Sequence, residues 1–327
     1  MHLKSRIMFK IIKDWTLPIA MLTGVASYFV YASIPFLNGT HQTAMRLIAV
    51  VQPLLLFTML FLTFCKVRPH DLHRAKWQPW LLVTQCIAFL ACVLTLWLMP
   101  NGPWRIVIES AMLCLICPTA TSAAVVTRKL GGNAGTLMAY TIAINLAVSL
   151  LVPAVVPIIH PNPDQTFLTS FLIIISKVFP LLLGPLLLSI AMRRIAPRTV
   201  EWLAQKRDLP FYIWSVCLAL AIAVSTRSIV HTTCPWPYQV AIAVASLITC
   251  IAQFMLGRRI GQKYHDPISA AQACGQKNTV LIIWMGYTFM TPVTSIAGGF
   301  YSIWHNLYNS WQMYQKRIEE EKWTRTS

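Results

Sequence analysis

The chain has 327 residues, of which 56% are hydrophobic and only 11% are Asp, Glu, Lys or Arg. This charged fraction is less than half the share usual in soluble domains, and it excludes a secreted disulfide scaffold, a nucleic-acid-binding module and a cytosolic enzyme. The formal net charge of +17 arises from basic residues that lie between apolar runs. This pattern is typical of an integral membrane protein, whose partner is the lipid bilayer and not nucleic acid.

Ten apolar segments are long enough to cross a bilayer, which takes about 20 helical residues for roughly 30 Å of hydrocarbon. They lie near residues 15–34, 43–65, 77–98, 104–126, 135–156, 166–192, 211–226, 238–257, 267–290 and 293–311. We therefore predict an all-α integral membrane protein with ten transmembrane helices. The first segment is too long, and is followed by too many others, to be a cleaved signal peptide, so we expect it to remain.

The basic residues predict the orientation of the chain. With a cytoplasmic N-terminus, 22 of the 27 Lys and Arg residues fall in cytoplasmic segments. The positive-inside rule then predicts a multi-pass protein of the cytoplasmic (inner) membrane with both termini in the cytoplasm and residues 315–327 as a cytoplasmic tail. The nine cysteines lie mostly within the spans and predict no disulfide framework. No pattern in the sequence predicts an oligomeric state.

Two of the predicted spans are interrupted about halfway across the bilayer. The fourth contains Cys-Pro-Thr-Ala-Thr-Ser at 117–122, and the ninth contains Gln-Ala-Cys-Gly-Gln-Lys-Asn at 272–278. Proline removes a backbone donor and disfavours helix at the residue before it. Interruptions of this kind persist within a membrane only where they are buried in protein or line a cavity. The alternative interpretation is that Pro118 and Gly275 only kink two packed helices.

The two breaks occupy equivalent positions in the two halves of the chain. Each lies in the fourth of five spans, and an odd number of spans gives the halves opposite topology. We predict two inverted repeats, 14–159 and 166–314, whose broken helices cross at a central binding site, as in secondary transporters. The residues expected to form this substrate and crossing region are Pro118, Thr119, Thr121, Ser122, Gly275, Gln276, Asn278 and Asn306.

Three stretches of the sequence resemble the bile acid:sodium symporter family. The run Cys-Pro-Thr-Ala-Thr-Ser-Ala-Ala-Val-Val-Thr at 117–127, followed by Gly-Asn at 132–133 and Leu-Val-Pro at 151–153, is similar to its fourth and fifth spans. Ala-Cys-Gly-Gln-Lys-Asn at 273–278 is similar to its Glu-Val-Gly-x-Gln-Asn element. Pro292 with Gly-Gly-Phe-Tyr-Ser-Ile-Trp-His-Asn at 298–306 is similar to its last span.

The resemblance implies a division into two domains and a class of substrate. Spans three to five and eight to ten would form a core domain, and spans one, two, six and seven would form a panel domain. An amphipathic organic anion, bile acid-like or pantoate-like, would pass through the cleft between them by alternating access.

The departures from the family concern its sodium sites. The Ser-Asn pair of the first break is replaced by Ala123 and Ala124, and a serine of the fifth span by Leu137, while a threonine is kept as Thr141. The Glu and Gln of the ninth-span element become Ala273 and Lys277. Because a hard cation needs several oxygen ligands, we expect transport without the family's sodium coupling, no bound metal and no other cofactor.

Lys277 stands where a bound cation would lie and suggests what replaced it. Its ammonium group can bond to free carbonyls of the broken helix, to Gln85 on the third span or to Asn278. Burial favours the neutral amine, so the lysine can exchange a proton during the cycle and couple transport to protons. The alternatives are a permanently charged lysine that holds the crossing together, and a degenerate site that no longer transports.

Three further residues are candidates for function. His305, with Asn306, is expected to brace the crossing through hydrogen bonds, a proton relay being the alternative. Glu109 is expected to partner Lys177 or Lys277 or to line the outer cavity, or else to be solvated near the mouth. Lys177 is expected to line a cavity and attract a substrate carboxylate, or to snorkel towards the interface.

Two other functions compete with a carrier of organic anions. One is an arsenite or other oxyanion efflux permease, in which Cys117 would be a soft ligand. The other is a membrane sensor that binds its ligand without transporting it. The sequence contains no Gly-x-Ser-x-Gly, no paired intramembrane aspartates and no His-Glu-x-x-His, so we expect no enzyme activity.

Overall fold

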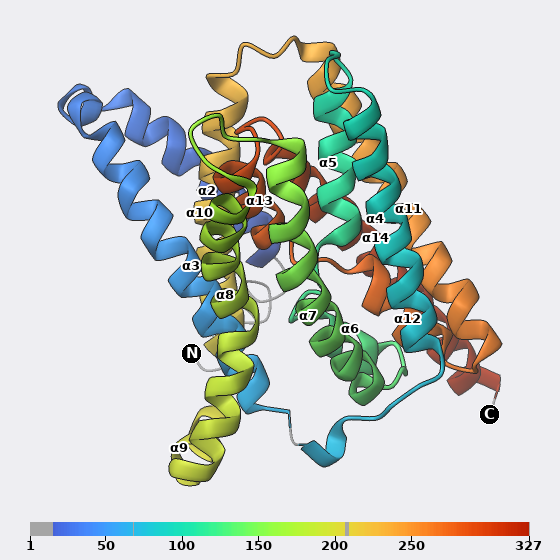
Figure 1. The fold of residues 1–327 in the computed structure, drawn as a ribbon. Coiled ribbons are helices and arrows are strands. Elements are labelled where there is room, and N and C mark those ends of the chain that lie inside the picture. The colour runs from blue at the N-terminus through green and yellow to red at the C-terminus, as the bar shows by residue number, and fades with distance from the viewer. Residues whose placement is uncertain (1–15, 68, 207–208, 327) are drawn as a thin grey trace.

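The computed structural model describes residues 16–67, 69–206 and 209–326, and these residues form a helical bundle without strands (Figure 1). Its elements in chain order are α2 (Thr16–Ser33), η1 (Pro35–Thr40), α3 (His41–Cys65), η2 (Pro69–Asp71), α4 (Trp77–Leu98), α5 (Arg105–Ile116), α6 (Ala123–Lys129), α7 (Ala134–Ile159), α8 (Phe167–Ile195), α9 (Pro197–Gln205), α10 (Leu209–Val230), α11 (Trp236–Lys263), α12 (Pro267–Gly275), α13 (Thr279–Phe289) and α14 (Ile296–Thr326). Residues 1–15, with the predicted cytoplasmic Lys4, Arg6, Lys10 and Lys13 and the start of the first predicted repeat, lie outside the described residues.

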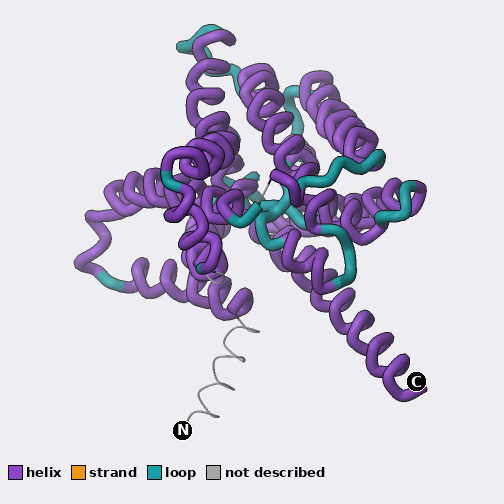
Figure 2. Tube along the Cα trace, turned by 90° about the horizontal axis from the view of Figure 1, so that it is seen from below, coloured by secondary structure: helices purple, strands orange, loops and turns teal. Residues whose placement is uncertain are grey.

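The helices pack in two groups. Helix α10 packs against α2 and α3, and α8 packs against α3, so these four helices form one group. In the other group, α11 packs against α5, α12 and α14, while α4 packs against α5 and α7. Helix α7 also packs against α8 and thereby joins the groups (Figure 1). Seen from below, loop segments lie in the middle of the bundle (Figure 2).

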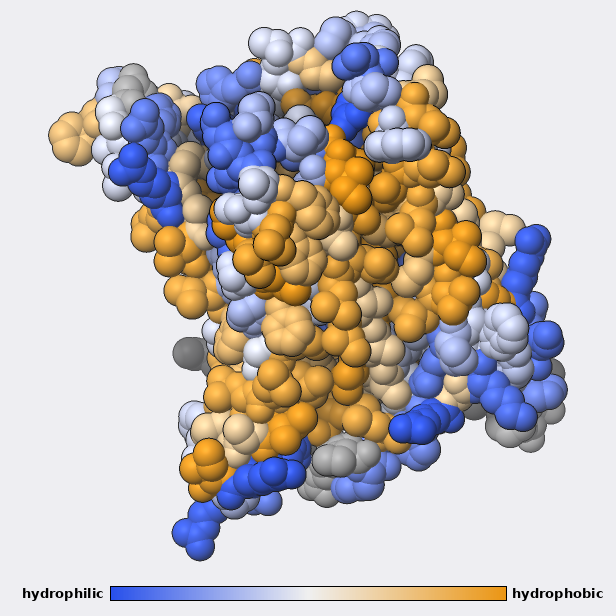
Figure 3. Space-filling model, in the orientation of Figure 1, coloured by the Kyte–Doolittle hydropathy of each residue, from blue (hydrophilic) through white to orange (hydrophobic). Residues whose placement is uncertain are grey.

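Many large apolar side chains are exposed on the outer surface of the bundle. Among the described residues, six helices are long and apolar enough to cross a membrane, namely α3, α4, α7, α8, α11 and the part Tyr212–Val230 of α10. Two shorter helices, Ile19–Ser33 and Thr279–Phe289, are apolar as well. On the face in Figure 3, a hydrophobic band separates hydrophilic residues at the top from those at the bottom. The chain is therefore a multi-pass integral membrane protein.

The observed helices differ from the predicted segments at several ends. The fourth predicted span is divided into α5 and α6, and the ninth into α12 and α13. The seventh is longer than expected, because α10 continues to Val230. Residues 197–205, between the sixth and seventh predicted spans, form the separate helix α9, which begins at Pro197. Most of the predicted tail 315–327 continues the last helix, since α14 ends only at Thr326.

Two glycines let α12 lie directly on α11. A Cβ on Gly257 would lie 2.4 Å from the carbonyl oxygen of Ala270, and one on Gly261 would lie 2.5 Å from that of Asp266. Gly257 and Gly261 are four residues apart, which is the spacing that allows close approach of helices in membranes. This contact fixes α12, and with it the position of the second break.

An arginine joins the two longest helices of the first group. The Arg193 guanidinium on α8 donates from Nη2 to the carbonyl oxygens of Phe64, Cys65 and Val67 at the end of α3, at 3.2, 2.9 and 2.6 Å. Carbonyls at a helix C-terminus lack the amide partners of the next turn; the Phe64 carbonyl also accepts from the Val67 amide at 3.2 Å. Arg193 therefore caps α3 and ties it to α8.

Replacing Arg193 with alanine should destabilise the bundle. The change removes charge-assisted hydrogen bonds worth about 1.5–3 kcal/mol, so we expect a lower midpoint of thermal unfolding in detergent. Arg194→Ala is the matched control, because Arg194 is the next residue in the chain and its side chain is exposed. Equal midpoints for the two variants would contradict the capping role.

Candidate functional site

The two interrupted spans meet and pair with each other. Between α5 and α6, and between α12 and α13, the chain leaves the helix, and Thr119 and Lys277 face each other in an antiparallel bridge. The Ala120 amide donates to the carbonyl oxygen of Gln276 at 2.8 Å, and the Asn278 amide donates to that of Pro118 at 2.9 Å. Each break thus supplies backbone partners that the other has lost.

Local sequence explains where both helices stop. Cys117 precedes a proline and adopts φ −51°, ψ 138°, the extended backbone that this position favours. In the second break, Gln276 is also extended, and Asn278 has φ −75°, ψ 84°. Asn278 then caps α13, because its Oδ1 accepts from the Leu281 amide at 3.3 Å.

Lys277 is the charged group of the crossing. Its side chain is 1% exposed, and Nζ donates to the carbonyl oxygen of Leu115 at 3.2 Å. Leu115 lies in the last turn of α5, where carbonyl groups lack helical partners and carry the partial negative charge of the helix dipole. A cation at this point both satisfies a carbonyl and balances the dipole.

Gln85 approaches the same helix end from α4. Its Nε2 lies 3.4 Å from the carbonyl oxygen of Ile116 and 3.5 Å from that of Cys117, while its Oε1 accepts from the Tyr140 hydroxyl at 2.7 Å. Of the three partners considered for Lys277, the described hydrogen bond goes to the helix carbonyl, and Gln85 serves neighbouring carbonyls instead. The end of α5 therefore receives a lysine and a glutamine side by side.

The end of α12 is satisfied by two hydroxyl groups. Thr119 Oγ1 donates to the carbonyl oxygen of Ala273 at 2.6 Å, and the Tyr301 hydroxyl donates to that of Gly275 at 2.8 Å. Gln253 Nε2 in turn donates to the Tyr301 hydroxyl at 3.0 Å. Tyr301 and Gln253 were missed in the sequence, although a lone glutamine in the apolar run of the eighth span is a usable signal.

The other predicted crossing residues make side-chain contacts at the crossing or lie next to residues that do. Gln276 Nε2 donates to Ser122 Oγ at 2.9 Å, which links the two breaks. The Cys117 thiol donates to the carbonyl oxygen of Asn278 at 3.1 Å. Thr121 is half-buried in the turn that leads into α6.

The positions at which the resemblance predicts lost sodium ligands are buried and offer almost no side-chain oxygen. Ala123, Ala124, Leu137 and Ala273 are each less than 9% exposed. The hydroxyl of Thr141 donates to the carbonyl oxygen of Leu137 one turn earlier in α7, at 3.0 Å. In the part of the chain that the structure describes, no group of three or more His, Cys, Asp or Glu residues is arranged to hold a metal ion.

The expected bracing of the crossing by His305 and Asn306 is wrong. Asn306 Nδ2 donates to the carbonyl oxygen of Ser302 in its own helix at 2.6 Å. His305 is buried, its ring packs edge-on against Tyr301, and its Nδ1 has no hydrogen-bond partner among the described residues. Tyr301, one helical turn earlier, reaches the crossing instead, because its longer side chain extends to Gly275.

The expected partners of Glu109 were also wrong. Glu109 is 1% exposed, and its Oε1 lies 2.9 Å from Arg105 Nε and 3.2 Å from His160 Nε2. Its Oε2 accepts from the Thr294 hydroxyl at 3.4 Å. Arg105 lies one helical turn from Glu109 on α5, and residues at this spacing are neighbours on the helix surface. Glu109 therefore pairs with Arg105 and not with either lysine.

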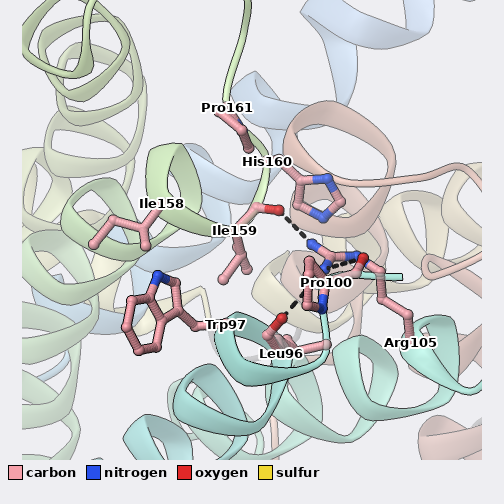
Figure 4. Close-up of a pocket in the computed structure, with 8 residues that line it drawn as sticks. All are labelled: Leu96, Trp97, Pro100, Arg105, Ile158, Ile159, His160 and Pro161. Atoms are coloured by element: carbon pink, nitrogen blue, oxygen red, sulfur yellow. Dashed lines mark hydrogen bonds between the residues drawn. The ribbon is translucent and has the colours of Figure 1, made fainter. Parts of the chain in front are cut away.

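Two cavities lie at the end of the bundle where α5 begins and α7 ends. Figure 4 shows the larger, of about 380 Å³, in which the Arg105 guanidinium points toward His160 and donates to the carbonyl oxygens of Ile159 and Pro100. The second, of about 260 Å³, shares His160 and is also lined by Lys177 of α8. The structure thus brings Lys177 to a cavity and not to Glu109 or the crossing.

Comparison with known proteins places the chain in a family. The model of the sodium bile acid symporter family matches residues 53–233, which is more than half of the chain. No curated protein matches the chain.

Replacing Thr119 with valine should weaken the crossing. Valine keeps the shape of the side chain but leaves the buried Ala273 carbonyl without its donor, a loss of about 1–3 kcal/mol. We expect a lower thermal midpoint in detergent. Thr141→Val is the matched control, because that hydroxyl bonds only within its own helix, and the idea fails if both variants unfold alike.

Proposed function

Because the chain belongs to the sodium bile acid symporter family, a family of membrane transporters, we propose that it carries amphipathic organic anions by alternating access without the family's sodium coupling. The substrate would be bile acid-like or pantoate-like. The observation that carries the proposal is the buried ammonium group of Lys277 at the C-terminal end of α5. The resemblance adds that the family's sodium ligands would be replaced by side chains without oxygen.

The proposed architecture is two inverted repeats that make ten spans. Helices α2 to α7 would form the first repeat and α8 to α14 the second, with α5 and α6 equivalent to α12 and α13. The packing supports a panel of α2, α3, α8 and α10 beside a core of α4 to α7 and α11 to α14. In this mechanism the panel moves against the core, and the crossing is exposed to each side in turn.

In the proposed orientation, the protein lies in the cytoplasmic (inner) membrane with both termini in the cytoplasm. The ends of α3, α6, α8 and α11 lie at the lower end of the bundle in Figure 1. The sequence carries basic residues at or near each of these ends, including Lys66, Lys129, Arg194 and Lys263. By the positive-inside rule this end would face the cytoplasm, and the cavities around His160 would face outward.

Lys277 would act as a tethered cation that exchanges a proton. When one side opens, Nζ would take a proton from water and hold it against the Leu115 carbonyl while the anion is bound. On the other side the proton would leave from Nζ to water, and the neutral amine would return. The anion and the proton would then move in the same direction, and no bound sodium ion would be needed.

The first experiment compares driving forces in proteoliposomes. Uptake of a labelled bile acid is measured with an inward sodium gradient, an inward proton gradient or neither. Protein-free vesicles under the same gradients measure passive entry of the protonated acid. We expect uptake above this background with the proton gradient and no response to sodium, and uptake driven by sodium would overturn the proposed coupling.

Replacing Lys277 with methionine should separate coupling from static support. Methionine fills a similar volume without a charge, so we expect a folded protein whose accumulation of substrate no longer responds to the proton gradient. Lys129→Met, at the exposed end of α6, is the control and should behave as the unaltered protein. Uptake by Lys277→Met that still follows the proton gradient would rule out the lysine as the coupling group.

A double variant tests whether sodium can be restored. Ala273→Glu with Lys277→Gln returns the two family residues of the second break, and we expect a partial response to a sodium gradient.

Two further outcomes distinguish the alternative functions. A protein that binds substrate but shows no uptake in any vesicle experiment would favour a sensor. Loss of arsenite tolerance in cells with Cys117→Ser would instead favour an oxyanion permease.

A further inference from the structure

The smaller cavity lies where the two proposed domains meet. Its walls come from the end of α7, the first half of α8 and the end of α13, including Val156, Ile174 and Phe289. Helix α8 belongs to the packing group of α2, α3 and α10, whereas α7 belongs to the other group and α13 packs mainly against α14 of that group. A ligand in this cavity would therefore touch both proposed domains.

Lys177 lines this cavity deep within a membrane-spanning helix, although charged groups are usually found at the ends of such helices. It lies ten residues after Phe167, the first residue of α8, and so about 15 Å from that helix end at 1.5 Å per residue. The side chain is exposed, and among the described residues it has no ion pair or hydrogen bond. An ionisable residue at such depth is costly and therefore marks a functional site.

Two acidic residues lie near the cavity lining and neither is part of it: Glu109 contacts His160, and Asp164 follows Asn162 in the loop before α8. Glu109 is held between Arg105, His160 and Thr294, with both carboxylate oxygens engaged. Its negative charge is buried and does not compete for Lys177. The cavity therefore presents a positive charge to a ligand, which favours an anion.

The remaining lining combines an apolar wall with hydrogen-bond donors. Ile173, Ile174 and Phe289 give the apolar wall. Gln165 lines the cavity too, and its Oε1 accepts from Ser170 Oγ at 3.2 Å, which leaves its amide N–H groups without a partner among the described residues. Lys177 and Gln165 are thus two donors beside an apolar surface.

The volume limits what the cavity can hold. About 260 Å³ is below the range of roughly 300–1,000 Å³ usual for whole drug-sized ligands. It fits the carboxylate end of a larger molecule, or a small organic acid, better than an entire sterol.

We propose that Lys177 and Gln165 form an outer subsite that binds the carboxylate of an amphipathic monoanion between α7, α8 and α13. This subsite rests on the proposed function, because it assumes that the substrate is an organic anion. It is separate from the crossing, where Lys277 would handle the proton. Lys177 would set the affinity for the negative charge, and the apolar wall would accept the adjoining part of the substrate.

Equilibrium binding to the purified protein tests the subsite independently of transport. Labelled cholate is the anionic probe and its methyl ester is the neutral one. We expect Lys177→Met to weaken cholate binding about tenfold, as for loss of one charge-assisted hydrogen bond, and to leave binding of the ester unchanged. Lys177→Arg should keep most of the affinity for cholate. Arg46→Gln, an outer cation that does not line the cavity, is the control and should match the unaltered protein.

Several results would overturn the subsite. Equal weakening of cholate and its ester by Lys177→Met would indicate a change of shape and not a lost charge. No change for cholate in the folded variant, or no cholate binding by the unaltered protein, would also reject it. If the unaltered protein transports but Lys177→Met keeps its KM, the subsite fails while the proposed function stands. If cholate binds in a Lys177-dependent way but is never transported, the proposed function fails and the subsite stands.

Discussion

The structure depends on how two broken helices satisfy their backbone inside a membrane. Hydrocarbon offers no hydrogen bonds, so every amide and carbonyl freed by a break needs a protein partner. The segments around Pro118 and Lys277 meet this demand by pairing with each other. The carbonyls left at the ends of α5 and α12 are then taken up by the side chains of Lys277, Gln85, Thr119 and Tyr301. The crossing is therefore one connected network, and its residues are buried because exposure to lipid would leave it unsatisfied.

The same geometry explains why a positive charge belongs at the crossing. Helices α5 and α12 end there and α6 and α13 begin there, so both negative and positive helix ends are present. Lys277 Nζ lies at a negative one, the C-terminal end of α5. A bound sodium ion with oxygen ligands is one way to balance such an end, and a buried lysine is another. The lysine needs no ligand set, which fits the buried alanines at 123, 124 and 273, whose side chains carry no oxygen. In the proposed mechanism its proton is the one mobile part of an otherwise fixed arrangement.

The sequence was sufficient for features that depend on local chemistry. Pro118 and the polar run up to Asn278 located both breaks, because neither stretch can continue a helix in lipid. It was insufficient where the partner is set by packing. In the sequence, several basic residues were possible partners of Glu109. Only the fold shows that Arg105 and His160 contact its carboxylate. His305 was chosen over Tyr301 because spacing cannot tell which of two residues one turn apart reaches a neighbouring helix.

Two lysines illustrate how surroundings assign different roles to the same side chain. Lys277 is enclosed and bonded to a helix end, so any change of its charge acts on the crossing itself. Lys177 is exposed in a cavity between helices of the two packing groups, so its charge acts on whatever enters. If the panel moves against the core, the walls around Lys177 must separate, whereas the paired backbone around Lys277 stays within the core. Recognition of the anion at the mouth and balancing of charge at the crossing would then be separable steps of one cycle, joined only through the movement of the panel.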